Sequence, residues 1–301
     1  MATLSLRVAT YNISGGEKTF EEFPHDTQQS RQEALALLVA RLDADLLCLQ
    51  EVSQHTDADG VVHTLLDPIN QAGSYNHSFF APTVSMANDL QVKKDVMVTG
   101  IFNDWRNWSK GNAFHSRIPF ARLGDPTEIG IPRSVPLYQP SRYEGTRDTD
   151  PRCALIARLK ASPFPYVVNL HLTTLLGERY PQAMQNKVEE AQMLRYQQVS
   201  RFLDLVRRHI LQKDEPLILA GDFNAAPDEF CLAHLLESES GFLRLTPENK
   251  GPSHAGSKAM IDHILFYPRD RLVDYTCYIE EGNLSYRASD HLPVVAELKI
   301  K

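Results

Sequence analysis

The stretch LILAGDFNAAP, residues 217–227, decides how the chain is interpreted. Apolar and small residues run into a glycine, and Asp222 and Asn224 then follow two positions apart. Side chains two positions apart in an extended chain point to the same side. The stretch therefore predicts a buried strand whose end presents a carboxylate and a carboxamide side by side.

Comparable patterns occur along the rest of the chain. Apolar and β-branched runs predict strands at residues 6–13, 45–52, 111–123, 153–159, 165–174, 259–267 and 289–300. Apolar residues at helical spacing predict helices within 26–45, at 182–211 and at 229–238. The Pro- and Arg-rich stretch 131–152 has turn chemistry throughout and is predicted to be loop. This mixture indicates an α/β protein in which helices cover sheets in one layered domain.

The composition excludes several protein classes. The 301 residues are 43% hydrophobic and 23% charged, as in ordinary globular proteins and unlike disordered or fibrous ones. The four cysteines lie far apart without a C-x-x-C pair, which indicates neither a zinc site nor a disulfide framework. The N-terminus has no leader pattern, and no apolar run approaches the ~18 residues of a membrane span. We therefore expect a soluble, unexported protein of the reducing cytoplasm.

The charge is unevenly distributed along the chain. A net charge of −7 disfavours a protein that coats nucleic acid, but residues 91–160 contain 12 Lys and Arg against 7 Asp and Glu. Interleaved aromatic and basic residues there suit base stacking and phosphate contacts, although a solvated loop with aromatic anchors is an equal alternative. They are Trp105, Arg106, Trp108, Lys110, Arg133, Tyr138, Arg142, Tyr143, Arg147 and Arg152.

Polar residues recur where the predicted strands end. Each one alone is more often a turn or capping residue. Together their oxygens, without sulfur, suit Mg²⁺ better than zinc, and the imidazoles can donate to a phosphoryl oxygen. The combination favours hydrolysis of a phosphoester. The residues are Asn12, Glu51, His171, Asp222, Asn224, Asp262, Asp290 and His291.

Seven motifs occur in a characteristic order: TYNI, LQEV, GNAFHSRIP, VNLHL, GDFN, IDHILF and SDHLPV. In this order the sequence resembles the endonuclease/exonuclease/phosphatase superfamily, which contains deoxyribonuclease I and the exonuclease III type abasic-site endonucleases. The resemblance spans residues 8–298. It implies a four-layered α/β sandwich, with two mixed sheets packed face to face and helices outside. It also implies a single domain over residues 1–301.

The resemblance further implies roles for individual residues on the metal and water side of the site. Glu51 matches the principal metal ligand, with Asn12 beside it and Asp290 as a second carboxylate on the metal side. Asp222 matches the residue that orients and deprotonates the attacking water. Asn224 would hold the same water or a phosphate oxygen.

The resemblance also implies roles for the histidines. His171 resembles a donor to a non-bridging phosphate oxygen, and His291 resembles the imidazole nearest the scissile phosphorus. Asp262 would pair with His291, fixing its tautomer and favouring its protonated form. Asn112 aligns near a position that can orient the first histidine. His263 and His115 are expected to be structural.

The implied mechanism is a one-step, in-line attack of water, with Mg²⁺, or Mn²⁺ in its place, neutralising charge at the phosphate. The leading interpretation is a nuclease-type phosphodiesterase that contacts DNA or RNA through residues 91–160. The alternative is a hydrolase of a small or lipid-derived phosphoester, such as a phosphoinositide or sphingomyelin. A third, an inactive interaction module, is disfavoured by the complete set of site residues. Family resemblance does not select the substrate.

Overall fold

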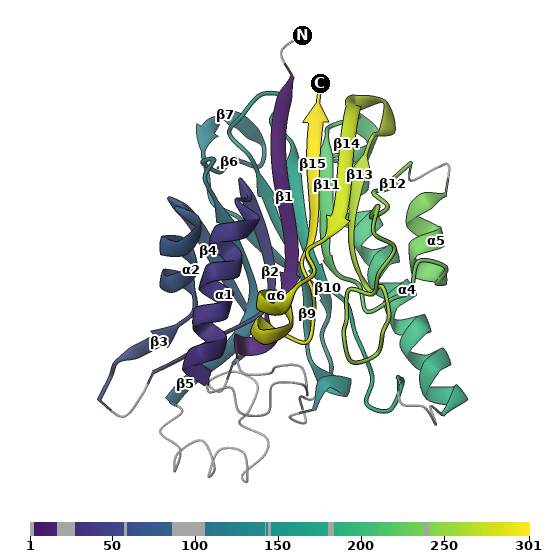
Figure 1. Cartoon of the computed structure of the whole chain (residues 1–301). Helices are drawn as coiled ribbons and strands as arrows, with labels where there is room; N and C mark the ends of the chain where they lie inside the picture. Colours follow the sequence, from purple (N-terminus) through teal and green to yellow (C-terminus); the bar gives the residue numbers. More distant parts are fainter. Residues whose placement is uncertain are drawn as a thin grey trace.

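The structure is a computed structural model that describes residues 3–16, 28–56, 59–85, 106–141, 143, 146–179, 184–237 and 241–301. Two mixed β-sheets pack against each other, and helices lie on their outer faces (Figure 1). This arrangement confirms the predicted α/β sandwich.

The first sheet has the strand order β14-β15-β1-β2-β5-β4, with β3 paired to β2. β1 and β2 are parallel, and helix α1 (Gln28–Leu42) connects them, because parallel neighbours need a crossover. Helices α2 (Leu66–Gly73) and α6 (Asn283–Ala288) pack beside α1. The strands are β1 (Leu4–Asn12), β2 (Leu46–Thr56), β3 (Val62–Thr64), β4 (His77–Ser85), β5 (Arg106–Ser116), β14 (Leu272–Ile279) and β15 (Val294–Ile300).

The second sheet has the order β12-β13-β11-β10-β9-β8. Its parallel pair, β10 and β11, is connected through helix α4 (Gln185–Arg207), and α5 (Phe230–Leu236) packs on α4. A separate hairpin pairs β6 (Ala121–Arg122) with β7 (Asp125–Ile129). The strands of the sheet are β8 (Arg133–Tyr138), β9 (Arg152–Arg158), β10 (Tyr166–His171), β11 (Leu217–Asp222), β12 (Leu243–Arg244) and β13 (Asp262–Tyr267).

Both faces of the central strands are buried, which explains their nearly continuous apolar sequences. In β11, Ile218 and Ala220 belong to the core between the sheets, whereas Leu217 and Leu219 belong to the core beneath α4 and α5. A third core lies between the first sheet and α1. The period-two alternation of a strand thus divides one apolar run between two layers.

A polar bridge crosses between the sheets. The side-chain amide of Asn169 in β10 donates to the carbonyls of Leu49 and Ala113, at 2.9 and 3.0 Å. Its Oδ1 accepts from Nε2 of Gln50 at 2.7 Å. Asn169 and Gln50 are fully buried, so the bridge fixes how β10 and β2 meet, immediately behind His171 and Glu51.

Several local predictions need correction. The predicted loop 131–152 contains β8 and a short 3-10 helix (Arg147–Thr149), because an edge strand tolerates the Pro136 that suggested a loop. The predicted helix 182–211 begins, within the described residues, at Gln185 and ends at Arg207. β4, β14, α2 and α6 had no counterpart in the sequence-based prediction. Among the described residues, no helix is long and apolar enough to cross a membrane.

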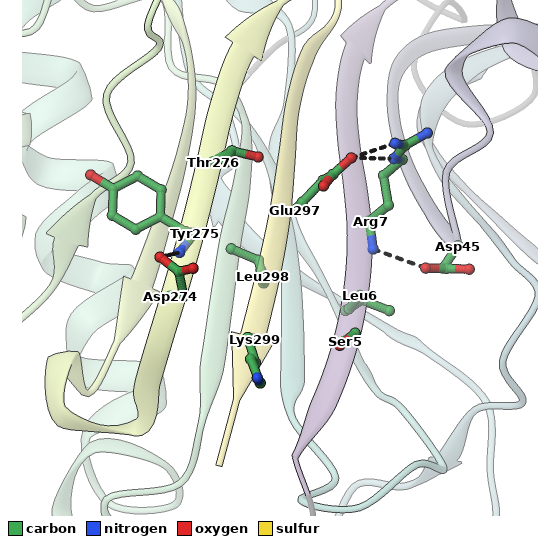
Figure 2. Close-up of a pocket in the computed structure, with 10 residues that line it drawn as sticks. All are labelled: Ser5, Leu6, Arg7, Asp45, Asp274, Tyr275, Thr276, Glu297, Leu298 and Lys299. Atoms are coloured by element: carbon green, nitrogen blue, oxygen red, sulfur yellow. Dashed lines mark hydrogen bonds and ion pairs between the residues drawn. The ribbon is translucent and has the colours of Figure 1, made fainter.

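A pocket of about 380 Å³ lies on β1, β14 and β15 (Figure 2). Three of its charged residues contact one another: Arg7 forms an ion pair with Glu297, and the Arg7 backbone N–H donates to Asp45. The pocket is lined by the first residues of β1, whereas Asn12 is the last residue of that strand. It is therefore separate from the predicted site residues.

Candidate active site

Strand register brings three of the predicted residues together. In the second sheet His171 pairs with Asp222, and Asp222 pairs with Asp262, so the three form one row across β10, β11 and β13. Gly221 precedes this row with φ +153°, and a Cβ there would lie 2.0 Å from the Leu170 carbonyl oxygen. Only glycine fits where β11 approaches β10 so closely.

Glu51 occupies a β-bulge in β2. The register moves from Leu49 opposite Ala113 to Val52 opposite Gly111, and Glu51 has a φ of 55°. A left-handed backbone costs a residue such as Glu about 1–2 kcal/mol. Bulges of this kind redirect a side chain, and here the bulge turns Glu51 toward Asn12 and His171.

Asp222 is the centre of the cluster and is 1% exposed. Its Oδ1 accepts from the backbone N–H of Asn224 at 2.8 Å, and its Oδ2 accepts from Nδ2 of Asn12 at 3.0 Å. The Nε2 atoms of His171 and His291 lie 3.6 and 3.8 Å from the same Oδ2. One carboxylate oxygen is therefore faced by nitrogen donors from both sheets.

His171 is held as a neutral donor by Arg152. Nη1 of Arg152 lies 3.0 Å from Nδ1 of His171, and because a guanidinium can only donate, Nδ1 must accept. The proton of the neutral ring is then on Nε2, which faces Asp222 and Glu51. Burial, assisted by the charge of Arg152, lowers the pKa of His171 to about 3.

This contact corrects one prediction. Asn112 was predicted to orient the first histidine, but its Nδ2 is buried with no hydrogen-bond partner among the described residues. Arg152 occupies that position instead, 5% exposed and 3.6 Å from Asp150. It is therefore part of the site and is not free to contact substrate, as the alternation of basic and aromatic residues had suggested.

His291, unlike the neutral His171, is held as a cation. The predicted contact with Asp262 is present, with His291 Nδ1 2.9 Å from Oδ2 of the fully buried Asp262. Burial by itself lowers the pKa of His291, but the carboxylates of Asp262 and Asp222 outweigh it and raise the pKa to about 10. The site thus combines a neutral imidazole with a cationic one.

The predicted strand 289–300 begins only at Val294, so Asp290 and His291 lie in the loop before β15. Asp290 accepts a hydrogen bond from the hydroxyl of Ser14. Burial by itself raises the pKa of Asp290, yet the charge of His291 and the Ser14 hydrogen bond lower it overall, so the carboxylate is ionised. Ser14 lies on the loop after β1, two residues beyond Asn12, so this contact joins the β1 loop to the β15 loop.

The residues predicted to bind a divalent ion fit it in part. Glu51 and Asp290 are carboxylates whose side chains are 23% and 24% exposed, and oxygen donors suit a hard cation. Lys110 lies 3.2 Å from Oε2 of Glu51, which raises the pKa of the lysine. Asn12 does not offer its oxygen, because its Oδ1 accepts from the Ser14 backbone N–H at 3.0 Å while Nδ2 faces Glu51 and Asp222. In this orientation the amide nitrogen of Asn12 faces both carboxylates, and its predicted role as a metal ligand stays a prediction.

Asn224 follows β11 with a φ of 50°, a conformation that asparagine tolerates. Its Nδ2 donates to the Leu172 carbonyl at 3.0 Å, and its own carbonyl accepts from Arg179. The side chain thus ties the β10 and β11 loops together. Its predicted contact with water or phosphate stays a prediction.

His254 was not predicted and lies at the site. Its ring packs edge-to-face on His291, with centroids 4.6 Å apart, and its Nε2 is 4.0 Å from Asp290 Oδ2. Its Nδ1 accepts from the Ser257 backbone N–H at 2.9 Å, so a neutral ring carries its proton on Nε2. Burial lowers the pKa of His254 to about 4, with a further contribution from His291.

The protonation of His254 determines whether one group of three side chains can bind a metal ion. His254, Asp290 and His291 lie close enough together to hold a metal ion. However, Nε2 of His254 carries a proton, and His291 is cationic, so neither ring has a lone pair to offer there. No sequence signal marked His254, which lies in a loop of turn-forming residues.

His263 and His115 have structural contacts, as expected. His263 Nε2 lies 2.9 Å from the Ala225 carbonyl oxygen, and its ring packs on Phe223. His115 Nδ1 lies 2.7 Å from Oδ1 of Asn70, and its ring is completely buried.

The basic excess of residues 91–160 does not form one surface in the part that the structure describes. Arg158 is buried against Glu215, and Arg117 pairs with Asp43. Arg133 and Arg147 are exposed. Residues 91–105 and Arg142 lie outside the described residues, and so does the side chain of Arg106.

Comparison with solved structures shows the same architecture. An endonuclease/exonuclease/phosphatase from Beutenbergia cavernae is 18% identical, with a TM-score of 0.66 over 98% of this chain and 72% of that one. Truncated Caenorhabditis elegans TDP2 is 17% identical, with a TM-score of 0.61 over 98% of this chain and 97% of that one. The human Nocturnin catalytic domain, solved with a bound sulfate anion, is 16% identical, with a TM-score of 0.62 over 100% and 96%.

At these identities the structural matches support the fold alone. No curated protein matches this sequence. The sequence does match the Endonuclease/Exonuclease/phosphatase family over residues 9–291, which include every predicted site residue from Asn12 to His291. The chain therefore belongs to the endonuclease/exonuclease/phosphatase family, whose members are phosphoesterases.

Proposed function

We propose that the protein, as one domain over residues 1–301, is a divalent-metal-dependent phosphodiesterase that hydrolyses its substrate by in-line attack of water. One observation carries this proposal: Oδ2 of Asp222 is faced by Asn12, His171 and His291, at distances of 3.0 to 3.8 Å. Both imidazole distances exceed a direct hydrogen bond, so neither Nε2 atom is committed to Asp222 and both remain available to a phosphoryl oxygen.

Each side chain then has a defined task. Asp222 accepts the proton of the attacking water. His171 donates from Nε2 as a neutral group, and His291 donates as a cation to a phosphoryl oxygen that gains negative charge. Asp262 keeps the His291 ring oriented and charged.

Glu51 and Asp290 would hold the divalent ion, for which Mg²⁺ is the best fit because both donors are carboxylates. Such an ion supplies charge neutralisation at the phosphate and the leaving oxygen. Asn12 supports both Glu51 and Asp222 through its amide nitrogen.

A nucleic acid or a nucleotide is the substrate class that the charges around the site support best. Lys110 at Glu51 and the partly buried Arg179 at Asn224 lie on two different segments near the cluster. Cations distributed in this way suit a substrate with several phosphates. No contact among the described residues specifically favours a lipid-derived phosphoester.

The test is hydrolysis of bis(p-nitrophenyl) phosphate with Mg²⁺, Mn²⁺, Zn²⁺ or EDTA, by the wild type and Asp222→Asn. DNA, RNA and a phosphoinositide are assayed in the same way with Mg²⁺. Asp204→Asn is a matched control, because Asp204 is an exposed carboxylate on α4. We expect activity only with Mg²⁺ or Mn²⁺, lost in Asp222→Asn and kept in the control. Full activity in EDTA would refute the metal dependence, and cleavage of phosphoinositide but not of DNA or RNA would refute the substrate class.

A further inference from the structure

The guanidinium of Arg179 contacts the loop that follows Asp222, and most of its donors are unused. Its Nη2 donates to the Asn224 carbonyl oxygen at 2.5 Å. Among the described residues this is its only hydrogen bond, and it forms no ion pair with them. Asn224 in turn donates its backbone N–H to Asp222, so Arg179 is one residue removed from the proposed base.

A buried charge network behind the site holds Arg179 in place. Arg195 of α4 is 1% exposed and contacts Glu229 at 2.6 Å and Glu178 at 2.6 Å. Oε2 of Glu178 accepts from the Leu175 backbone N–H at 2.9 Å. The segment that leads to Arg179 is therefore fixed from its inner side, and the neighbouring Glu178 is already engaged.

This environment leaves the charge of Arg179 undercompensated. The side chain is partly buried, and burial lowers the pKa of Arg179, although Asp222 and Glu178 oppose that effect. Removing a cation from water without full pairing is unfavourable. Guanidinium groups bind phosphates with several parallel hydrogen bonds, and a phosphate would supply the missing acceptors.

The position of Arg179 also indicates which part of the substrate it would contact. It is anchored to the loop after β11 through the Asn224 carbonyl oxygen, and the backbone N–H of Asn224 donates to Asp222. Arg179 therefore lies on the Asn224 side of the proposed base. Lys110 belongs to the other side, at Glu51.

We propose that Arg179 forms an anion subsite that binds a second phosphate of the substrate, next to the phosphate that is attacked. This inference rests on the proposed function. It predicts a preference for phosphodiesters with a neighbouring phosphate, as in a nucleic-acid chain or a nucleotide bisphosphate, over isolated diesters.

Two pairs of substrates test the subsite. Thymidine 5′-(p-nitrophenyl phosphate) is compared with its 3′-phosphorylated form, and the dinucleotide dTpdT with the 5′-phosphorylated pdTpdT. Wild type, Arg179→Gln and Arg179→Lys are assayed, with Arg207→Gln as the control, because Arg207 is an exposed arginine on α4. Binding of thymidine 3′,5′-bisphosphate and thymidine 5′-monophosphate is measured by calorimetry in EDTA.

The wild type should prefer the extra phosphate in at least one pair. Arg179→Gln should reduce that preference about 10-fold or more, the range for a hydrogen bond to a charged group, while the unphosphorylated partner changes little. Arg179→Lys should retain part of it, and Arg207→Gln all of it.

Two results overturn the subsite: no wild-type preference in either pair, or equal losses by Arg179→Gln on both members of a pair. A wild type that hydrolyses none of the compounds refutes the proposed function instead. In that case calorimetry still decides, because equal affinity of wild type and Arg179→Gln for the bisphosphate refutes the subsite.

Discussion

Replacing Asp262 with Asn tests whether the Asp262 carboxylate keeps His291 protonated. The change keeps the shape of the side chain but removes the charge 2.9 Å from His291 Nδ1. A carboxylate stabilises the imidazolium, so its removal lowers the pKa of His291 from its value of about 10. If His291 acts as a cation, the alkaline limb of kcat/KM should move to lower pH.

The expected shift of the alkaline limb can be worked out from the contact between Asp262 and His291. An opposite charge this close shifts an imidazole by about 1–3 pH units, so we expect the limb to move down by that amount. One unit corresponds to about 1.36 kcal/mol, so Asp262→Asn should also lower the free energy of unfolding by roughly 1.4–4 kcal/mol below pH ~6.5. Because the folded-state pKa of His291 is raised, this contribution is present below ~6.5 and is lost as the pH rises toward about 10.

The assay is the pH profile of kcat/KM for the wild type, Asp262→Asn, His291→Ala and the double variant, with urea unfolding at two pH values. Residues that act as one unit show overlapping losses, so the double variant should resemble His291→Ala. If the limb stays in place and the two single losses multiply, Asp262 does not act through His291 and the reasoning fails.

Four further expectations concern single changes. Asp222→Asn should lower kcat for bis(p-nitrophenyl) phosphate by at least ~10²-fold with little change in thermal stability, since it removes a positioned proton acceptor but keeps the shape. Adding EDTA should abolish turnover and Mg²⁺ should restore it, whereas Glu51→Gln should need a higher Mg²⁺ concentration for half-maximal rate. Arg152→Met should free Nδ1 of His171 and lower kcat about 10-fold, and NMR should show mixed His171 tautomers where the wild type has only Nε2–H. Asn169→Leu should cost about 3 kcal/mol in urea unfolding, because two buried carbonyls lose their donor.

The strands of the core and the residue types of the site could be predicted from the amino-acid sequence alone. Buried strands such as β11 have short, nearly continuous apolar sequences that are typical of central strands. Polar residues such as Asp222 mark the ends of these strands. Parallel neighbours carry such ends to one edge of a sheet, so His171 and Asp222 could be expected together before any coordinates were known.

Shorter and less apolar elements could not be predicted in this way. β14 is half exposed at the edge of its sheet, and β8 contains a proline, so neither has the continuous apolar pattern of a central strand. Their pairing depends on strands already in place, which supply the hydrogen-bond partners that their own sequences do not specify.

The protonation and orientation of the site side chains, in contrast, depend on tertiary contacts. Arg152, Ser257 and Asp262 set the proton positions of three histidines, and Arg179 reaches Asn224 from a segment 45 positions away in the chain. Such contacts depend on which single donor or acceptor atom lies within about 3 Å, a scale that residue type and spacing do not resolve. Motifs therefore identify which groups a site contains, whereas the packing of loops between the two sheets determines which atom of each group is presented.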